Sequence, residues 1–128
     1  MKYEFSFEKL EVWQTARMLV TDIYIITESF PDKEKFGLTN QMRRAAVSVC
    51  ANLAEGASRI SPKEQAHFTS IAYGSLIELL NHLIISSDLK FISEEKQNEL
   101  REKIQPLSVK INNLRNKQLS IANNQVKS

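Results

Sequence analysis

The stretch SPKEQAHFTSIAYGSLIELLNHLIISS, residues 61–87, decides the fold class of this chain. It opens with a capping box, in which the Ser61 side chain can accept from the Glu64 amide while Glu64 reaches back, and Pro62 suits the first helical position. Apolar residues then recur at three and four positions, as on one face of a helix: Phe68, Ile71, Ala72, Leu76, Leu79 and Leu83. The stretch therefore predicts one long amphipathic helix.

The apolar arc of this helix is wider than one bundle seam needs. Tyr73, Ile77, Leu80 and Ile84 extend it around the circumference. A helix that is apolar around most of its circumference is either central or covered by another chain. In the middle of a helix, Gly74 lowers helix stability by about 1 kcal/mol relative to alanine, a loss that the close approach of another helix could offset. Because no helix of a four-helix bundle is expected to be central, the arc predicts oligomerisation.

Breaks on either side of this helix divide the rest of the chain. They lie at residues 30–37, 56–62 and 88–93, and the whole chain holds only three glycines and three prolines. So few helix breakers favour a few long helices. We expect three further helices, Phe7 to Ser29, Thr39 to Gly56 with Thr39 as its N-cap, and Ser93 to about Lys117.

Short connections between long helices favour antiparallel neighbours, so we predict an all-α, antiparallel up-down-up-down four-helix bundle. Pro106 removes one hydrogen bond from the last helix and should kink it or split it in two. The predicted domain spans residues 1–118. The Asn-rich end of the chain has nothing to bury, so residues 119–128 are expected to fray.

Composition places the protein in the cytoplasm. Cys50 is the single cysteine, which excludes a disulfide framework within the chain. No secretory signal precedes the first helix, and the longest apolar stretch, around residues 83–85, is shorter than a membrane span, so we expect no membrane association. The net charge of +2 does not indicate a strongly basic nucleic-acid-binding domain.

No motif indicates catalysis. His67 and His82 lie about 22 Å apart along one helix, so they cannot share a metal within a subunit. Cys50 stands among apolar neighbours and is expected to be a core residue. We therefore expect no enzyme, no cofactor, no metal site and no small-molecule substrate.

Surface residues are the remaining candidates for function. The helix beginning near Thr39 carries a polar stripe opposite its apolar face, which is either solvated or a second contact surface. Candidate oligomer-interface residues are Ser48, Asn52, Glu55, Tyr73, Ile77, Glu78, Leu80 and Ile84. Candidate nucleic-acid-binding residues are Arg43, Arg44, Lys33, Lys35, Arg59 and Lys63, the first four expected at one end of the bundle and the last two at the other.

Six motifs in order resemble a known family. They are FEKLEVWQ at 7–14, FP at 30–31, EKFGL at 34–38, QMRRAAVS at 41–48, NLAEG at 52–56 and IAYGSLIE at 71–78. Over about residues 5–118 the chain resembles the small four-helix bundle proteins related to those encoded within intervening sequences of bacterial 23S ribosomal RNA genes. It is also similar to the accessory variability determinants of diversity-generating retroelements.

The resemblance implies a barrel-like homopentamer of antiparallel four-helix bundles. The retroelement proteins are basic pentamers that work with a reverse transcriptase and bind nucleic acid. For the residues that match the family motifs, the resemblance implies one of two roles: binding a ligand or holding the subunit interface together. These residues are chiefly Arg43, Arg44, Asn52, Glu55, Gly56 and Glu78.

Two hypotheses for function follow. In the first, a non-enzymatic homo-oligomer binds RNA, DNA or a nucleoprotein partner through Arg43, Arg44 and neighbouring lysines. In the second, the oligomer is a structural or protein-interaction scaffold, and the arginines pair with Glu55 or Glu78. The first predicts binding that weakens steeply with salt.

Overall fold

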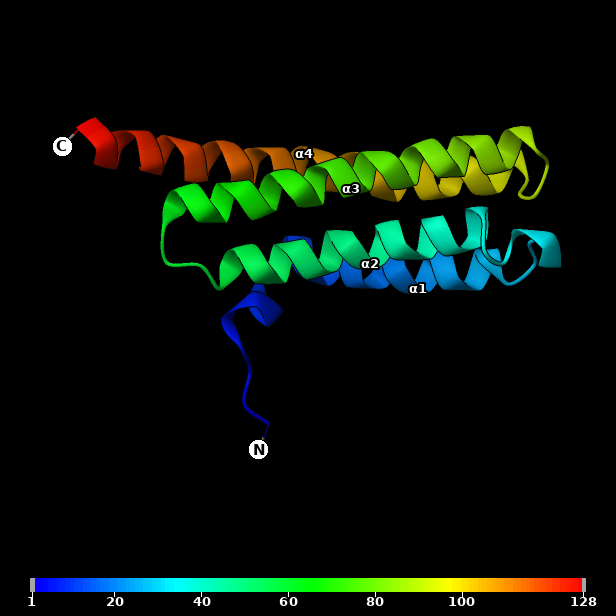
Figure 1. Cartoon of the computed structure of the whole chain (residues 1–128), viewed down its shortest axis with the longest axis horizontal. Helices are drawn as coiled ribbons and strands as arrows, with labels where there is room; N and C mark the ends of the chain where they lie inside the picture. The colour runs from blue at the N-terminus through cyan, green and yellow to red at the C-terminus, as the bar shows by residue number, and fades with distance from the viewer. Residues whose placement is uncertain (1, 128) are drawn as a thin grey trace.

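The computed structural model describes residues 2–127, except for the side chains of residues 126 and 127. These residues form four α-helices and two short 3₁₀ segments: η1 (Ser6–Lys9), α1 (Glu11–Thr27), η2 (Asp32–Glu34), α2 (Leu38–Ala57), α3 (Pro62–Asp88) and α4 (Glu94–Lys127). Figure 1 shows the four helices side by side, each running opposite to the one before it. The predicted antiparallel four-helix bundle is confirmed.

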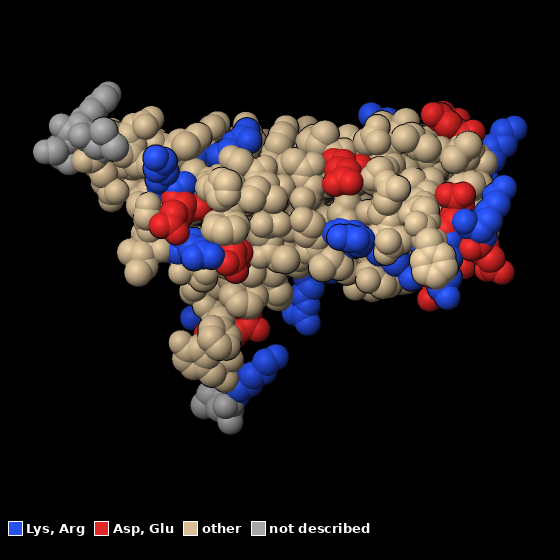
Figure 2. All heavy atoms as spheres, in the orientation of Figure 1, with Lys and Arg blue, Asp and Glu red and all other residues tan. Residues whose placement is uncertain are grey.

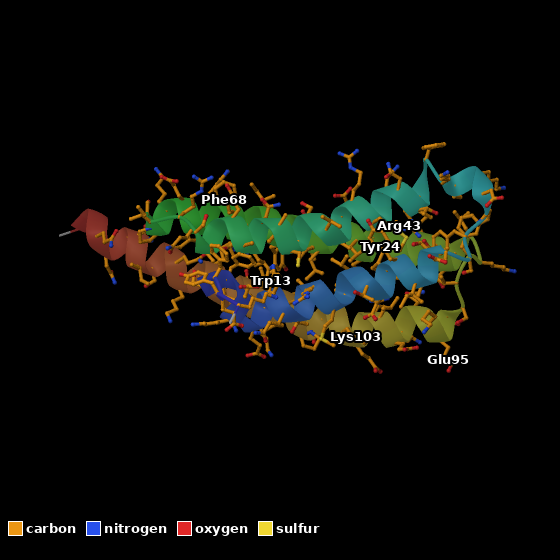
Figure 3. All side chains as sticks on the ribbon, turned by 90° about the horizontal axis from the view of Figure 1, so that it is seen from below. Trp13, Tyr24, Arg43, Phe68, Glu95 and Lys103 are labelled. Carbon is orange, nitrogen blue, oxygen red and sulfur yellow. The ribbon has the colours of Figure 1, made fainter. Side chains whose placement is uncertain are left out.

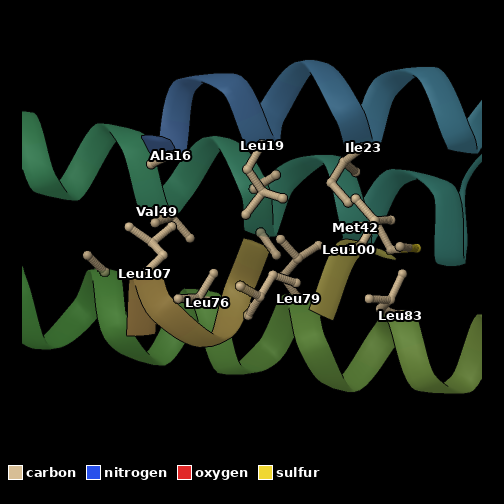
Figure 4. Packing of buried hydrophobic residues seen from close by; sticks show 14 of the residues in the cluster. Ala16, Leu19, Ile23, Met42, Val49, Leu76, Leu79, Leu83, Leu100 and Leu107 are labelled. Carbon is tan, nitrogen blue, oxygen red and sulfur yellow. The ribbon is translucent and has the colours of Figure 1, made fainter. Parts of the chain in front are cut away.

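The core is a layer of aliphatic side chains contributed by all four helices (Figure 4). Leu19, Met42, Leu79 and Leu107, one from each helix, are all buried. The spacing of three and four residues that predicted the helices brings these side chains to the bundle axis.

The four seams between helices are unequal. α3 packs extensively against both α2 and α4, whereas α1 and α4 share the smallest contact. Two ion pairs cross that smallest seam, Lys103 to Asp22 at 2.9 Å and Lys110 to Glu11. α3 thus has the most extensive contacts of the four helices, and part of its wide apolar arc is buried inside one subunit.

The start of the first helix was predicted too early. The chain forms η1 over Ser6–Lys9, becomes extended at Leu10 with φ −72° and ψ 120°, and begins α1 only at Glu11. The Glu8 carboxylate accepts from the Phe5 amide at 2.7 Å, and the Glu8 carbonyl accepts from Gln14 Nε2 at 2.8 Å. These local bonds stabilise the separate turn.

The predicted N-cap of the second helix is also wrong. α2 begins at Leu38, with Gly37 in the capping position, and Thr39 is buried within the first turn. The Glu34 carboxylate accepts from the Leu38 amide at 3.3 Å, and so caps the helix from the preceding loop.

The start of α3 is confirmed. Ser61 Oγ accepts from the Glu64 amide at 3.5 Å, and Pro62 is the first helical residue. The expected return bond from Glu64 is replaced by a contact with Arg59, whose Nη1 lies 4.0 Å from the Glu64 carboxylate.

The expected end of the last helix near Lys117 is wrong, because α4 is continuous to Lys127. Of the two alternatives expected at Pro106, the split is therefore wrong and the kink stays a prediction. Pro106 and Glu102, whose carbonyl loses its helical partner, are both exposed, so water can pair that carbonyl. The domain boundary at residue 118 and the fraying of residues 119–128 stay predictions.

By length and composition alone, α3 could cross a membrane. This differs from the expectation that no apolar stretch is long enough. The core helix of a bundle has the same composition, and Ala72, Leu76, Leu79 and Leu83 of α3 are fully buried among the other helices. The expected absence of a membrane partner remains a prediction.

Candidate assembly face and basic residues

The outer side of α2 and α3 forms one broad surface, which we call the α2–α3 face. Figure 2 shows that charged side chains are sparse over its middle, where an acidic and a basic patch lie close together, while more basic and acidic groups gather at the two ends of the bundle. Ile71, Glu78 and Ile85 follow one another at seven-residue spacing on the α2 side of α3, and the two isoleucines are 39% and 38% exposed. The face thus leaves aliphatic side chains in water.

Small polar residues of α2 and α3 form hydrogen bonds beneath this face. Ser48 Oγ and Ser75 Oγ are 2.8 Å apart, and Asn52 Nδ2 donates to the Ser48 carbonyl at 2.9 Å. The predicted interface residues Ser48 and Asn52 are therefore half-buried, and their polar groups are hydrogen-bonded within the chain.

The acidic interface candidates are paired with nearby residues of the same chain. Glu78 lies 3.3 Å from His82 Nε2, and Glu55 forms an ion pair with Arg59. His82 is buried, and its Nδ1 has no hydrogen-bond partner. Neither carboxylate pairs with Arg43 or Arg44 within the chain, so any such pairing would have to join two copies.

The remaining interface candidates lie on the other side of α3, towards α4. The Arg115 guanidinium of α4 lies over the Tyr73 ring, 4.8 Å from its centroid. Tyr73 and Leu80 pack half-buried against the core, and Ile77 and Ile84 share their side of the helix by spacing. The structure thus divides the predicted interface set into two surfaces.

Arg43 is a structural residue between α1 and α2 (Figure 3). Its Nε donates to Thr27 Oγ1 at 2.8 Å, its Nη2 donates to the Tyr24 carbonyl at 3.3 Å, and the guanidinium lies 4.5 Å from the Tyr24 ring centroid. Its neighbour Arg44 is exposed, and no carboxylate among residues 2–127 forms an ion pair with it. Adjacent arginines therefore have different roles.

The other basic candidates are divided in the same way. Arg59 pairs with Glu55 and lies 4.8 Å from the Phe68 ring centroid, so it is held in the turn between α2 and α3. Lys33, Lys35 and Lys63 are exposed. As predicted, the first loop and the second loop lie at opposite ends of the bundle (Figure 1).

Sequence reasoning missed an aromatic segment at the start of the chain, residues 2–7, which we call the N-terminal arm. The Tyr3 and Phe5 rings are 5.1 Å apart, Phe5 and Phe7 are 6.3 Å apart, and Phe7 meets Trp13 at 5.0 Å between centroids. Figure 1 shows the arm leading away from the bundle. The alternation of aromatic residues at 3, 5 and 7 was the signal that could have found it.

No constellation in the described part of the chain indicates catalysis. Residues 2–127 hold no group of three or more His, Cys, Asp or Glu side chains that could bind a metal ion. Burial raises the pKa of the Cys50 thiol, and the charge of Arg17 opposes this only in part. A protonated, half-buried thiol is a poor nucleophile.

Fold and surface together define a small all-helical bundle with an outer face that carries few charged side chains in its middle. Its sequence matches the profile of the 23S rRNA-intervening sequence protein family over residues 8–113, and the chain belongs to that family. A crystal structure of a protein of unknown function from the S23 ribosomal protein family of Bacteroides thetaiotaomicron has the same fold, with a TM-score of 0.67 at 20% identity, covering 87% of this chain and 97% of that one. Among curated proteins, none matches this sequence.

Proposed function

We propose that this protein acts as a non-catalytic homo-oligomer that assembles through the α2–α3 face. The observation that carries the proposal is the sparse charge in the middle of that face, with Ile71 and Ile85 exposed on it. Charged residues are depleted at the centre of protein interfaces, and contiguous exposed apolar surface marks interaction sites. The family resemblance favours five copies in a closed ring.

A charge placed on the α2–α3 face tests this proposal. We expect Ile71→Lys to raise the concentration at which the oligomer dissociates by about tenfold or more, because the ammonium would be buried without a partner. Val109→Lys is the matched control, since Val109 is 47% exposed on the outer side of α4. Light scattering gives the mass and circular dichroism the helix content. A folded Ile71→Lys chain with the wild-type mass at all concentrations would contradict the proposal.

Nucleic-acid binding by the assembled particle is a second candidate function. The observation that favours it is Arg44, which is exposed and free of carboxylate partners in the described chain. It lies in the N-terminal half of α2, towards the end of the bundle that carries the exposed Lys33 and Lys35. Rotational symmetry would repeat this group around a ring, and the summed charge would attract phosphates.

Substituting the two adjacent arginines one at a time distinguishes an effect on nucleic-acid binding from an effect on folding stability. Arg44→Ala is expected to reduce retention on RNA or DNA at low salt, with the free energy of unfolding changed by less than about 0.5 kcal/mol. Arg43→Ala is expected to lower that free energy by about 1–2 kcal/mol, because it removes the hydrogen bonds to Thr27 and Tyr24. Filter binding and urea unfolding measure the two effects. Equal retention of wild type and Arg44→Ala would refute a nucleic-acid role for Arg44.

A further inference from the structure

We infer that the N-terminal arm of one copy docks on α2 of a second copy, in a hollow at the edge of the α2–α3 face. This inference rests on the proposed homo-oligomer and names a contact within it. The hollow measures about 500 Å³ and is lined by Tyr24, Asn40, Arg43, Arg44, Val47 and Ser48.

The arm presents aromatic surface that its own chain does not cover. Tyr3 is 76% exposed and Phe5 is 59% exposed. The hydrogen bond from the Phe5 amide to Glu8 and the packing of Phe7 on Trp13 hold the base of the arm in place. Transfer of exposed aromatic rings from water into an interface is favourable, and such rings contribute a large share of the binding free energy.

The hollow has the chemistry to receive this segment. Arg43 and Arg44 are basic, Tyr24 and Val47 supply apolar surface, and no acidic residue lines it. The arm contains one lysine, Lys2, and one glutamate, Glu4, so its net charge is 0, and a second glutamate, Glu8, follows it directly. Aromatic rings with the carboxylates of Glu4 and Glu8 beside them thus complement a basic hollow with an aromatic wall.

Charge also favours a second copy over nucleic acid as the partner of the arm. The carboxylates of Glu4 and Glu8 flank the exposed rings, and they would repel the phosphates of any strand that stacked there. Because Arg44 and Ser48 line both the hollow and the neighbouring depression beside Glu78, the docked arm would continue the α2–α3 interface.

Such a contact joins two different surfaces, the arm of one copy and α2 of the next. Contacts of this heterologous kind propagate around a ring when the rotation between copies closes. The arm therefore supplies the second surface that a cyclic assembly through the α2–α3 face requires.

A disulfide between two chains tests the contact directly. Cys50 is the only cysteine, so Cys50→Ser chains that also carry Phe5→Cys or Val47→Cys have one thiol each. When a tagged Phe5→Cys chain is co-expressed with the Val47→Cys chain and mildly oxidised, we expect at least about tenfold more mixed dimer than with Val109→Cys. Val47 and Val109 are comparably exposed, at 42% and 47%, which makes the second pair a matched control.

Deleting residues 2–5 gives an independent measurement on a chain that keeps Phe7 and all four helices. We expect the dissociation concentration of the oligomer to rise about tenfold or more by light scattering. An oligomer of unchanged stability, or no excess of the mixed disulfide, would overturn the arm contact and leave the α2–α3 assembly standing. Unchanged mass with lost retention on single-stranded RNA would assign the arm to nucleic acid instead. A monomeric wild-type chain would overturn the proposed function as well.

Discussion

Leu76→Ala is expected to lower the free energy of unfolding by about 2–5 kcal/mol. Leu76 is 0% exposed and packs at the centre of α3, the helix with the most extensive contacts to its neighbours (Figure 4). Removing its isobutyl group leaves a cavity in a layer to which all four helices contribute, and long packed helices cannot all move to fill it. Urea unfolding followed by circular dichroism measures the loss.

Ile77→Ala is the control for this prediction. Ile77 is the next residue of the same helix and is 43% exposed, so its truncation creates no closed cavity. Its cost should stay below about 1 kcal/mol when measured on dissociated chains. Equal effects of the two substitutions would show that the core layer around Leu76 is not packed as described.

Gly56→Leu is expected to destabilise the bundle by about 3 kcal/mol. α2 lies close to α3 at this glycine, where an added Cβ would lie 3.2 Å from the Phe68 Cβ and 3.3 Å from the Gln65 carbonyl oxygen. Neither atom is the end of a flexible side chain, so a leucine can be accommodated only by moving α2 away from α3. Thermal unfolding should show a lower midpoint.

Gly74 provides the matching control on α3. Apart from its two chain neighbours and the nearby backbone of α3 itself, no atom of the described chain lies within 4 Å of where its Cβ would stand. Gly74→Ala should therefore raise the free energy of unfolding by about 0.5–1 kcal/mol through helix propensity. A destabilised Gly74→Ala chain, or an unaffected Gly56→Leu chain, would contradict this assignment of the two glycines.

The fold could be predicted because its determinants are local. The capping residue Ser61, the helical spacing of Leu76, Leu79 and Leu83, and the scarcity of helix breakers all act within one or two turns. Helix ends were less predictable, because tertiary partners decide them. Thr39 has the residue type of an N-cap, but the Glu34 carboxylate performs that role from the preceding loop.

The surface sites could be predicted only in part. Arg43 and Arg44 are indistinguishable in the sequence, and their difference arises from contacts of Arg43 with Tyr24 and Thr27, sixteen or more positions away. The two sides of α3 also look alike in a helical projection. The packing of Arg115 of α4 on Tyr73 shows which of the two sides faces α4.

The small seam between α1 and α4 has a consequence for how the bundle opens. Its two ion pairs, from Lys103 and Lys110 to Asp22 and Glu11, lie largely at the surface, where such pairs contribute little and are screened by salt. Local unfolding begins where buried contacts are fewest. We therefore expect α1 to separate from the bundle first, by movement of residues 28–37. The helices α2, α3 and α4 then stay packed together as one cooperative unit.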